Sequence, residues 1–400
     1  MPVVFHGASS TPSGSGNSGA SGKSGSTGKG SLQKPIRPQA KAHFLAAKRA
    51  EARSDWESAE REYSAAIQIA PRWAEAIVDL GIVYNRNGKP DKAIESFKSA
   101  LGLNPKLYGA YLDLAITYFK LQRYAEAEEP LREALSLQPG EPQASKLLLL
   151  SVFGEDKFEE TAALGKKIAN VSGQDAAVLE VTGRACLHLH DYKSAVQYLT
   201  ARAKLVPESA EVHLMLGEAL DNLNQEDSAI AEMRQAIQMA GKVELQDAHF
   251  ALGYVLWKLR RYDEAEPEFK KQLDVEPDHA PSTYYLGNIA LDKGDVSAAL
   301  PLLESASKAI PNDFAVHYDF GKALLQSDKI EQAVAELRTA ISINPKKADA
   351  HFQLGLALKR SGQQADSDKE FATVRELNEQ ERADLERKVQ GEEKKDKPPL

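Results

Sequence analysis

One short segment of this sequence has the residue types of a phosphate-binding loop. Gly22, Lys23 and Ser24 match the last residues of the glycine-rich loop that holds nucleotide phosphates. That loop also needs a glycine five residues before Gly22, a strand before it and a helix after it. Residue 17 is Asn17, and both flanks are rich in glycine and serine. A flexible-linker composition therefore explains the segment better than nucleotide binding does.

The nine histidines are the residues best suited to metal or acid–base chemistry. His188 and His190 flank Leu189 with Asp191 beside them, a weak indication of a metal site because no further partner stands at a known ligand spacing. Five other histidines occupy one recurring place in the chain. Because they are spread over successive segments, they cannot converge on one metal ion, and we expect them to pack between helices. These five are His43, His213, His249, His317 and His351.

The remaining candidates for chemistry are few. Cys186 is the single cysteine, so no internal disulfide can form, and we expect a buried, inert thiol. The sequence contains no zinc-protease motif, nucleophile elbow or dinucleotide-binding fingerprint. We therefore expect no catalytic residue, no cofactor and no bound metal, and we predict that the chain is not an enzyme.

The segments that position these residues repeat along the chain. Alanines, glycines and prolines recur with a period of 34 residues and share one slip of two residues. The slip lies between Ala236 and His249, and we place it in 241–246. The recurring prolines are Pro71, Pro105, Pro139, Pro207, Pro277, Pro311 and Pro345, and the recurring glycines are Gly81, Gly183, Gly217, Gly253, Gly287, Gly321 and Gly355.

Each period is predicted to contain two amphipathic helices separated by a polar break. Between residues 74 and 105 the apolar stripes are Ile77, Leu80, Val83 and Tyr84, and then Ala93, Ile94, Phe97 and Ala100. Pro105 follows the second stripe, where a residue that cannot continue a helix is expected. Gly81 and Ala93 are both small, so we expect the two helices to cross closely at these residues.

The pattern Leu80-Gly81-x-x-Tyr84, followed by Ala93-x-x-x-Phe97-x-x-Ala100 and Pro105, resembles the tetratricopeptide repeat. The resemblance covers about residues 40–379, or ten units. It implies an all-α fold in which antiparallel helix pairs stack into a right-handed superhelical α-solenoid. It also implies a concave face lined mainly by the first helix of each unit. Such arrays serve many unrelated processes, so the resemblance is specific for the fold and not for a function.

Four segments of different character are expected. Seventeen of residues 7–31 are glycine or serine, which is typical of a flexible segment. Terminal units of a solenoid need a polar outer face, and the last unit here departs from the repeat, with Ser367 and Glu379 in place of an alanine and a proline. The expected boundaries are a disordered leader at 1–38, the solenoid at 39–379, a polar-faced capping helix at 380–390 and a disordered tail at 391–400.

The fourth unit, 142–175, fits the repeat poorly. Leu149 and Thr161 stand where a glycine and an alanine are expected, and Gly173 replaces the proline. Each unit of a solenoid contacts only its neighbours, so a poor unit weakens the array locally. We expect a bend or a joint of low stability at 150–175.

The charge of the chain excludes some classes of partner. The net charge is −8, and the first forty residues hold four cations and no acid, so the remainder is more acidic still. An acidic body argues against a nucleic-acid binder, because phosphate contacts need a basic face. No apolar run approaches the length of a membrane span, and no secretory signal is evident. We expect a cytoplasmic protein, or an exported one if the true start lies upstream.

The last four units predict an aromatic face. One column reads Phe250, Tyr284, Tyr318 and Phe352, and the next turns add Tyr254, Asn288, Lys322 and Leu356, then Trp257, Leu291, Leu325 and Lys359. These rings either line the concave side or pack between units, and we favour binding because aromatic side chains dominate recognition surfaces. The residues predicted to contact a partner are Phe250, Tyr254, Trp257, Tyr284, Asn288, Tyr318, Lys322 and Phe352.

The N-terminal half predicts a second, more aliphatic face, with Phe44, Val78, Leu112, Phe119, Asn85, Arg86 and Lys120. Chaperone-binding members of the resembled family grip a terminal carboxylate with lysines and asparagines. The equivalent places here hold Val78, Asp79, Ile82, Leu112 and Asp113, so that clamp is missing.

The leading functional hypothesis is a non-catalytic scaffold whose groove at 246–360 binds a peptide segment of a protein partner. One alternative is a structural subunit of an assembly that makes contact through the convex face or the capping helix. A more remote alternative is the binding arm of a separately encoded glycosyltransferase. The glycosyltransferase hypothesis is weakened by three aspartates that stand where such an arm would carry a ladder of asparagines: Asp79, Asp113 and Asp319.

Overall fold

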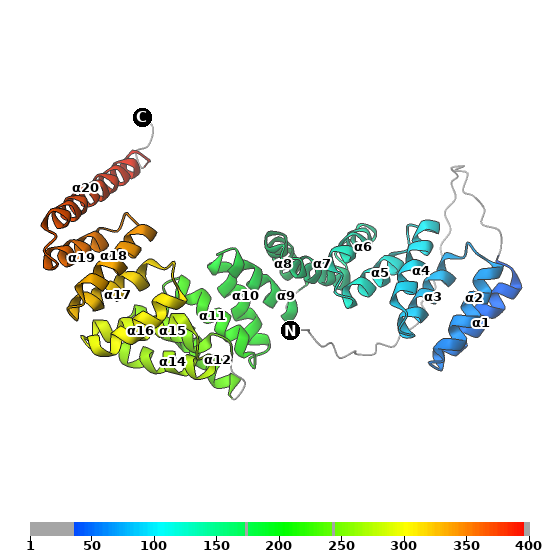
Figure 1. Ribbon diagram of the computed structural model, residues 1–400. Coiled ribbons are helices and arrows are strands. Elements are labelled where there is room, and N and C mark those ends of the chain that lie inside the picture. Colours follow the sequence, from blue (N-terminus) through cyan, green and yellow to red (C-terminus); the bar gives the residue numbers. More distant parts are fainter. Residues whose placement is uncertain (1–35, 173–174, 242–244, 396–400) are drawn as a thin grey trace.

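The computed structural model describes residues 36–172, 175–241 and 245–395, and it shows only helices and short connections within them. The helices follow one another in a curved row, so that α1 and α20 lie at opposite ends of the molecule (Figure 1). The predicted fold class, a right-handed superhelical α-solenoid of antiparallel helix pairs, is confirmed.

Twenty helices form ten pairs in the described part of the chain, and each pair is one unit. The first helices are α1 (Pro38–Ala52), α3 (Ala74–Arg86), α5 (Tyr108–Lys120), α7 (Pro142–Gly154), α9 (Ala176–His188), α11 (Ala210–Asn222), α13 (Ala248–Lys258), α15 (Ala280–Asp292), α17 (Phe314–Gln326) and α19 (Ala348–Arg360). The second helices are α2 (Trp56–Ile69), α4 (Pro90–Leu103), α6 (Tyr124–Leu137), α8 (Phe158–Ser172), α10 (Tyr192–Leu205), α12 (Glu226–Ala240), α14 (Tyr262–Val275), α16 (Val296–Ala309), α18 (Ile330–Ile343) and α20 (Gln364–Lys395).

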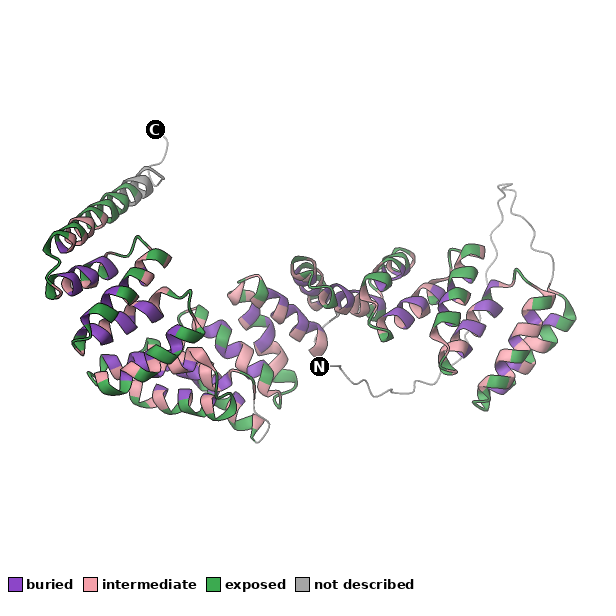
Figure 2. Cartoon of the chain, in the orientation of Figure 1, coloured by how far each residue is buried: buried purple, intermediate pink, exposed green. Residues whose placement is uncertain are grey.

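The two helices of a pair cross where the sequence places a small residue. A Cβ added to Gly81 would lie 2.6 Å from the Phe97 ring, which is closer than real atoms approach. The same relation joins Gly253 to Phe269, at 2.9 Å. Both rings are completely buried, so the repeated glycine lets a large ring of the second helix fill the space between the helices. The buried residues form stripes along the helices in Figure 2.

Each turn inside a pair contains one residue with a left-handed backbone. Three of these ten residues are glycines, for which a positive φ carries no steric cost: Gly88, Gly294 and Gly362. The other seven are Ser54, Gln122, Asp156, His190, Asn224, Arg260 and Asp328. These turns occupy the polar breaks predicted from the sequence, and the seven L-residues adopt a conformation that costs each of them some stability.

The irregular places of the repeat are also visible in the structure. Unit four is a complete pair, α7 and α8, in which Leu149 and Thr161 are fully buried. Gly173 and residues 242–244 of the predicted slip lie outside the described residues. The connection from α12 to α13 spans 241–247, which places the extra residues between Ala236 and His249 as predicted.

The C-terminal end differs from the expected one. A separate capping helix was predicted at 380–390, but α20 continues without a break from Gln364 to Lys395. Residues 380–387 are exposed on this helix. A polar helix needs no partner to remain soluble, so the last helix of the array simply extends past its pair. The leader before residue 36 and the tail after 395 lie outside the described residues.

None of the helices in the described ranges combines the length and the apolar character that crossing a lipid bilayer would require.

Candidate partner-binding face

The predicted aromatic column lies on four successive first helices. Phe250 is on α13, Tyr284 on α15, Tyr318 on α17 and Phe352 on α19. Residues one period apart face the same way, because each unit repeats the geometry of the one before it. Their exposure differs: Tyr284 is only 8% exposed, Phe250 and Tyr318 are half-buried, and Phe352 is 44% exposed. The column is therefore open to solvent at its C-terminal end and closed at Tyr284.

A ring cluster forms around Tyr285, which sequence reasoning missed. Its ring centroid lies 4.7 Å from Trp257, 5.5 Å from Tyr254 and 6.0 Å from Phe250. It also stacks on the buried Phe269 at 5.3 Å. The available signal was the pair Tyr284-Tyr285, whose second member stands in the column that holds Asp79, Asp113 and Asp319 in other units. Burial raises the pKa of Tyr285 to about 12, so its hydroxyl stays protonated.

A chain of hydrogen bonds runs across three first helices. Nε1 of Trp257 on α13 donates to Oδ1 of Asn288 on α15 at 2.8 Å. Nδ2 of Asn288 donates to Oδ2 of Asp319 on α17 at 2.8 Å, and the hydroxyl of Tyr284 donates to the same oxygen at 2.9 Å. Burial raises the pKa of Asp319, and the two donors oppose that rise.

This chain corrects the expected roles of two residues. Asn288 was expected to offer a polar group to a partner, and Tyr284 to offer a ring, but both are 8% exposed and bonded to Asp319. A buried amide or hydroxyl must find an internal partner, and Asp319 supplies one. The structure places both residues inside the stack, where they hold α15 against α17.

The accessible part of the predicted set is smaller. Tyr254, Tyr318 and Lys322 are half-buried, and Phe352 is exposed. The ammonium of Lys322 lies 5.6 Å from the centre of the Tyr318 ring, and that ring stacks on Phe314 at 5.6 Å. We define the aromatic face as the solvent-accessible rings of α13 to α19: Phe250, Tyr254, Trp257, Tyr285, Tyr318 and Phe352.

The five recurring histidines contact the second helix of their own unit. In each case the ring Nδ1 lies 2.5–2.7 Å from Oε2 of a glutamate. The pairs are His43–Glu62, His213–Glu232, His249–Glu268, His317–Glu336 and His351–Glu370. The prediction of a helix-contact role is confirmed, and the partner is the same residue type in all five units.

The histidines near the end of α9 are used separately. His188 stacks on Phe158 with centroids 4.0 Å apart, and His190 is hydrogen-bonded to the Tyr192 hydroxyl at 2.8 Å. Asp191 caps α10 and pairs with Lys166 at 2.9 Å. Each group has its own neighbour, so these residues do not form one ligand set. Cys186 is fully buried, and burial raises the pKa of its thiol.

One group of side chains has the residue types of a metal site. Potential ligand atoms of Asp247, Glu276 and His279 lie within 4.8 Å of one another. However, Nδ1 of His279 accepts the backbone N–H of Ser282 at 3.2 Å as the cap of α15. Nδ1 also lies 2.8 Å from the Ser282 hydroxyl, and Nε2 lies 3.7 Å from a carboxylate oxygen of Asp247. These contacts give His279 a structural role at the start of α15, and a group of three half-buried or exposed side chains does not by itself make a metal site.

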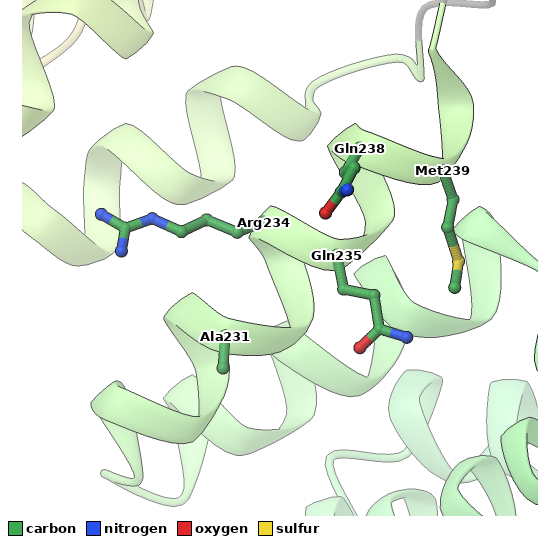
Figure 3. Close-up of a pocket in the computed structure, with 5 residues that line it drawn as sticks. All are labelled: Ala231, Arg234, Gln235, Gln238 and Met239. Atoms are coloured by element: carbon green, nitrogen blue, oxygen red, sulfur yellow. The ribbon is translucent and has the colours of Figure 1, made fainter.

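A shallow hollow lies on α12, lined by Ala231, Arg234, Gln235, Gln238 and Met239 (Figure 3). All five residues are exposed and belong to one helix. Small-molecule sites usually enclose their ligand between several elements, so this hollow does not have the form of one.

The structure also places the N-terminal set. Val78, Leu112 and Phe119 are half-buried on α3 and α5, and Lys120 is exposed. Nδ2 of Asn85 donates to Oγ1 of Thr117 at 2.7 Å, so this amide is used inside the stack. Phe44 stacks on Trp73 at 4.5 Å and thus packs between units one and two.

Comparison with known families identifies this array. The sequence model of the family described as "Cilia and flagella-associated protein 70 C-terminal domain" matches residues 15–251. Models described as "Tetratricopeptide repeat" and "TPR repeat" match residues 250–314 and 321–362.

Among curated proteins, the chain is similar to small glutamine-rich tetratricopeptide repeat-containing protein 2 of Mycosarcoma maydis. The two are 28% identical over 138 residues, which are 34% of this chain and 36% of that protein. The match thus spans little more than a third of the relative's length.

Among solved structures, the chain is similar to the Cut9-Hcn1 hetero-tetramer of APC/C, with a TM-score of 0.45 and 14% identity over 84% of this chain and 81% of that one. It is also similar to YrrB, described as a TPR protein with an unusual peptide-binding site, with a TM-score of 0.41 and 20% identity over 48% of this chain and 97% of that one. Likenesses at these scores carry no argument about what this chain binds.

Proposed function

The chain belongs to the tetratricopeptide repeat proteins, in the family described as the cilia and flagella-associated protein 70 C-terminal domain, and on that premise we propose that it is a non-catalytic scaffold for protein partners. The aromatic face of units seven to ten, on α13, α15, α17 and α19, binds a peptide segment of such a partner. A cytoplasmic setting is part of this proposal, because the single cysteine is buried and free.

The observation that carries the proposal is the gathering of partly exposed rings on successive first helices. Tyr254, Trp257 and Tyr285 lie within 6 Å of one another, measured between ring centroids. Tyr318 and Phe352 continue the face over the next two units. Partly exposed rings that adjoin one another along one side of a protein are typical of interaction sites.

The energetics suit a peptide ligand. A buried aromatic anchor contributes about 2 kcal/mol or more at an interface. The rings here are already held by the stack, and the chain Trp257–Asn288–Asp319 fixes the helices that carry them. A preformed surface loses little conformational entropy when a ligand binds, so more of the contact energy appears as affinity.

The test uses the full chain with Tyr254, Tyr318 and Phe352 replaced together by alanine. These three side chains are half-buried or exposed and take no part in the hydrogen bonds that join α13, α15 and α17 through Trp257, Asn288 and Tyr284, so the substitutions should leave the fold intact. Proteins captured from native lysate by the wild-type chain should be lost with the triple variant, as measured by quantitative mass spectrometry.

The matched control is Tyr192→Ala on the second helix α10, which removes a half-buried ring outside the aromatic face. It should retain the captured proteins. Equal capture by the triple variant and the wild type, with unchanged circular dichroism, would disprove the proposed face.

A second candidate function follows from α20. This helix has 32 residues, whereas its partner α19 has 13, and residues 380–387 are exposed beyond the pair. Leu385 is 64% exposed there. A projecting helix of this kind would suit the assembly role, in which the scaffold joins a larger complex through its C-terminal end. Loss of co-purifying subunits on replacing Leu385 with glutamate would favour this role.

A further inference from the structure

Three first helices carry an aspartate at the same place of the repeat. Asp79 lies on α3, Asp113 on α5 and Asp319 on α17. Residues at this place face the first helix of the preceding unit, as the contacts of Asp79 and Asp319 show. Burying part of a carboxylate between helices is costly unless a donor or a cation compensates it. The side chain that contacts each aspartate therefore shows how the charge of that aspartate is compensated.

Two of the three aspartates take their partner from the preceding unit. The ammonium of Lys48 on α1 lies 2.9 Å from Oδ2 of Asp79. Tyr284 and Asn288 on α15 both donate to Oδ2 of Asp319. Lys48 and Asn288 stand at the same place of the repeat, each 31 residues before the aspartate that it contacts, and Tyr284 stands 35 residues before Asp319.

Among the described residues, Asp113 has no such partner. The two places that supply Asp319 are occupied before Asp113 by Val78 and Ile82, whose aliphatic side chains cannot donate. The Asp113 carboxylate receives no hydrogen bond or ion pair from any residue in the described ranges. Lys120 acts on it only at a distance, and the ionised Asp79 repels it.

The surroundings of Asp113 make this more than a solvated surface charge. Leu112 and Ile116 stand one residue before and three residues after Asp113 on α5, Val78 and Ile82 occupy the places of α3 that supply donors in the unit before Asp319, and all four are half-buried. We call these four residues and Asp113 the aliphatic face. Burial is the main cause that raises the pKa of Asp113 to about 6, which shows how poorly the site compensates the charge.

We propose that the aliphatic face binds a peptide segment of a partner protein that carries one lysine or arginine between apolar side chains, and that the cation pairs with Asp113. The cation of the peptide takes the position that Lys48 takes against Asp79 one unit earlier. Its apolar neighbours cover Val78, Ile82, Leu112 and Ile116, and this removes water from the ion pair.

Charge complementarity selects this occupant. A carboxylate among aliphatic side chains attracts a cation more strongly than an exposed one does, because the local dielectric is low. An acidic segment would place two like charges together and is rejected. The proposal is independent of the aromatic face, which lies on other helices and contains other residue types.

The probe is a pool of random twelve-residue peptides displayed on phage and selected on the immobilised full chain. Asp113→Asn removes the charge and keeps the shape. Ile82→Lys supplies an internal cation from the place that Lys48 occupies before Asp79, so it satisfies Asp113 without a peptide. The triple variant Tyr254→Ala, Tyr318→Ala and Phe352→Ala reports on the aromatic face alone.

We expect one class of selected peptides to carry a single lysine or arginine among apolar residues. Synthetic members of this class should bind the wild type at least about tenfold more tightly than Asp113→Asn or Ile82→Lys, as the loss of one charge-assisted bond implies. The triple variant should bind them as the wild type does.

Two results would overturn the proposal. One is a selection with no enrichment of cations among apolar residues. The other is a cationic class whose binding is unchanged in Asp113→Asn. If such a class is lost only with the triple variant, the peptides bind the aromatic face, which supports the proposed function and refutes a separate aliphatic site. Circular dichroism of each variant confirms that the helices are retained.

Discussion

Leu149 on α7 and Gly165 on α8 exchange the sizes that the same two places have in most other units. In most other units a glycine on the first helix meets a large residue on the second, as Gly81 meets Phe97. In unit four the large residue is on the first helix and is fully buried. A Cβ added to Gly165 would lie 1.9 Å from Oγ1 of Thr182 on α9. The unit departs from the repeat in sequence, yet Leu149 is fully buried and Gly165 is closely packed against α9.

Gly165→Ala should destabilise the array because the added methyl group has no space beside Thr182. Overpacking a buried site costs about 1–3 kcal/mol. The loss should appear as a lower urea midpoint in circular dichroism. Gly102→Ala on α4 is the control, since nothing lies within 4 Å of an added Cβ there. Alanine should stabilise that helix slightly, and an unchanged midpoint for Gly165→Ala would contradict the size exchange.

Tyr284→Phe should weaken the contact between α15 and α17. The change leaves the buried Asp319 carboxylate with Asn288 as its one remaining side-chain donor among the described residues. Loss of a hydrogen bond to a charged group costs about 1.5–3 kcal/mol. Chemical denaturation measures the loss. Tyr285→Phe is the neighbouring control, because no described residue bonds to its hydroxyl, and equal effects of both changes would argue against the network.

Asp113→Asn should stabilise the protein at neutral pH. The folded pKa is about 6 and the ordinary value is 3.8, so the folded chain retains this proton longer than the unfolded chain does. Ionisation therefore removes stability as the pH rises from about 4 to about 6. The free energy of unfolding of the variant should exceed that of the wild type by at most about 3 kcal/mol at pH 7. Solvent around the partly exposed side chain reduces this gain.

The measurement is the free energy of unfolding at pH 4 and at pH 7. Wild type and Asp113→Asn should be alike at the lower pH and should differ at the higher one. Asp349→Asn, at an exposed site of α19, controls for the loss of one negative charge. A gain of the same size at both pH values would show that the ionisation of Asp113 is not its cause.

Gln122→Gly should raise the stability of the turn between α5 and α6. Gln122 has a φ of 58° and is exposed, so its side chain contributes strain without packing. A glycine removes a cost of about 1 kcal/mol, less its own entropy in the unfolded chain. Thermal unfolding measures the gain. The reverse change, Gly88→Gln in the turn between α3 and α4, should lower the midpoint, and a rise there would refute the strain argument.

The sequence alone determined the helix pairs, their period and the place of the two-residue slip. These features follow from local rules: apolar spacing defines a helix, a proline ends it, and a glycine marks a close crossing, as at Gly81. The recurring histidines were likewise predicted to be helix contacts. The prediction of a joint of low stability at 150–175 stays open, and hydrogen exchange of α7 and α8 compared with α6 would test it.

Only the tertiary structure decided which face residues are accessible and how they are paired. Tyr284 and Phe352 stand at the same place of the repeat, yet one is buried and the other exposed, because exposure depends on the residues that the neighbouring units bring against them. Asp319 receives its two donors from the preceding unit. The unit before Asp113 offers no donor at the same two places. A one-dimensional pattern shows the period, but pairing across units is a relation between side chains that only the packed helices establish.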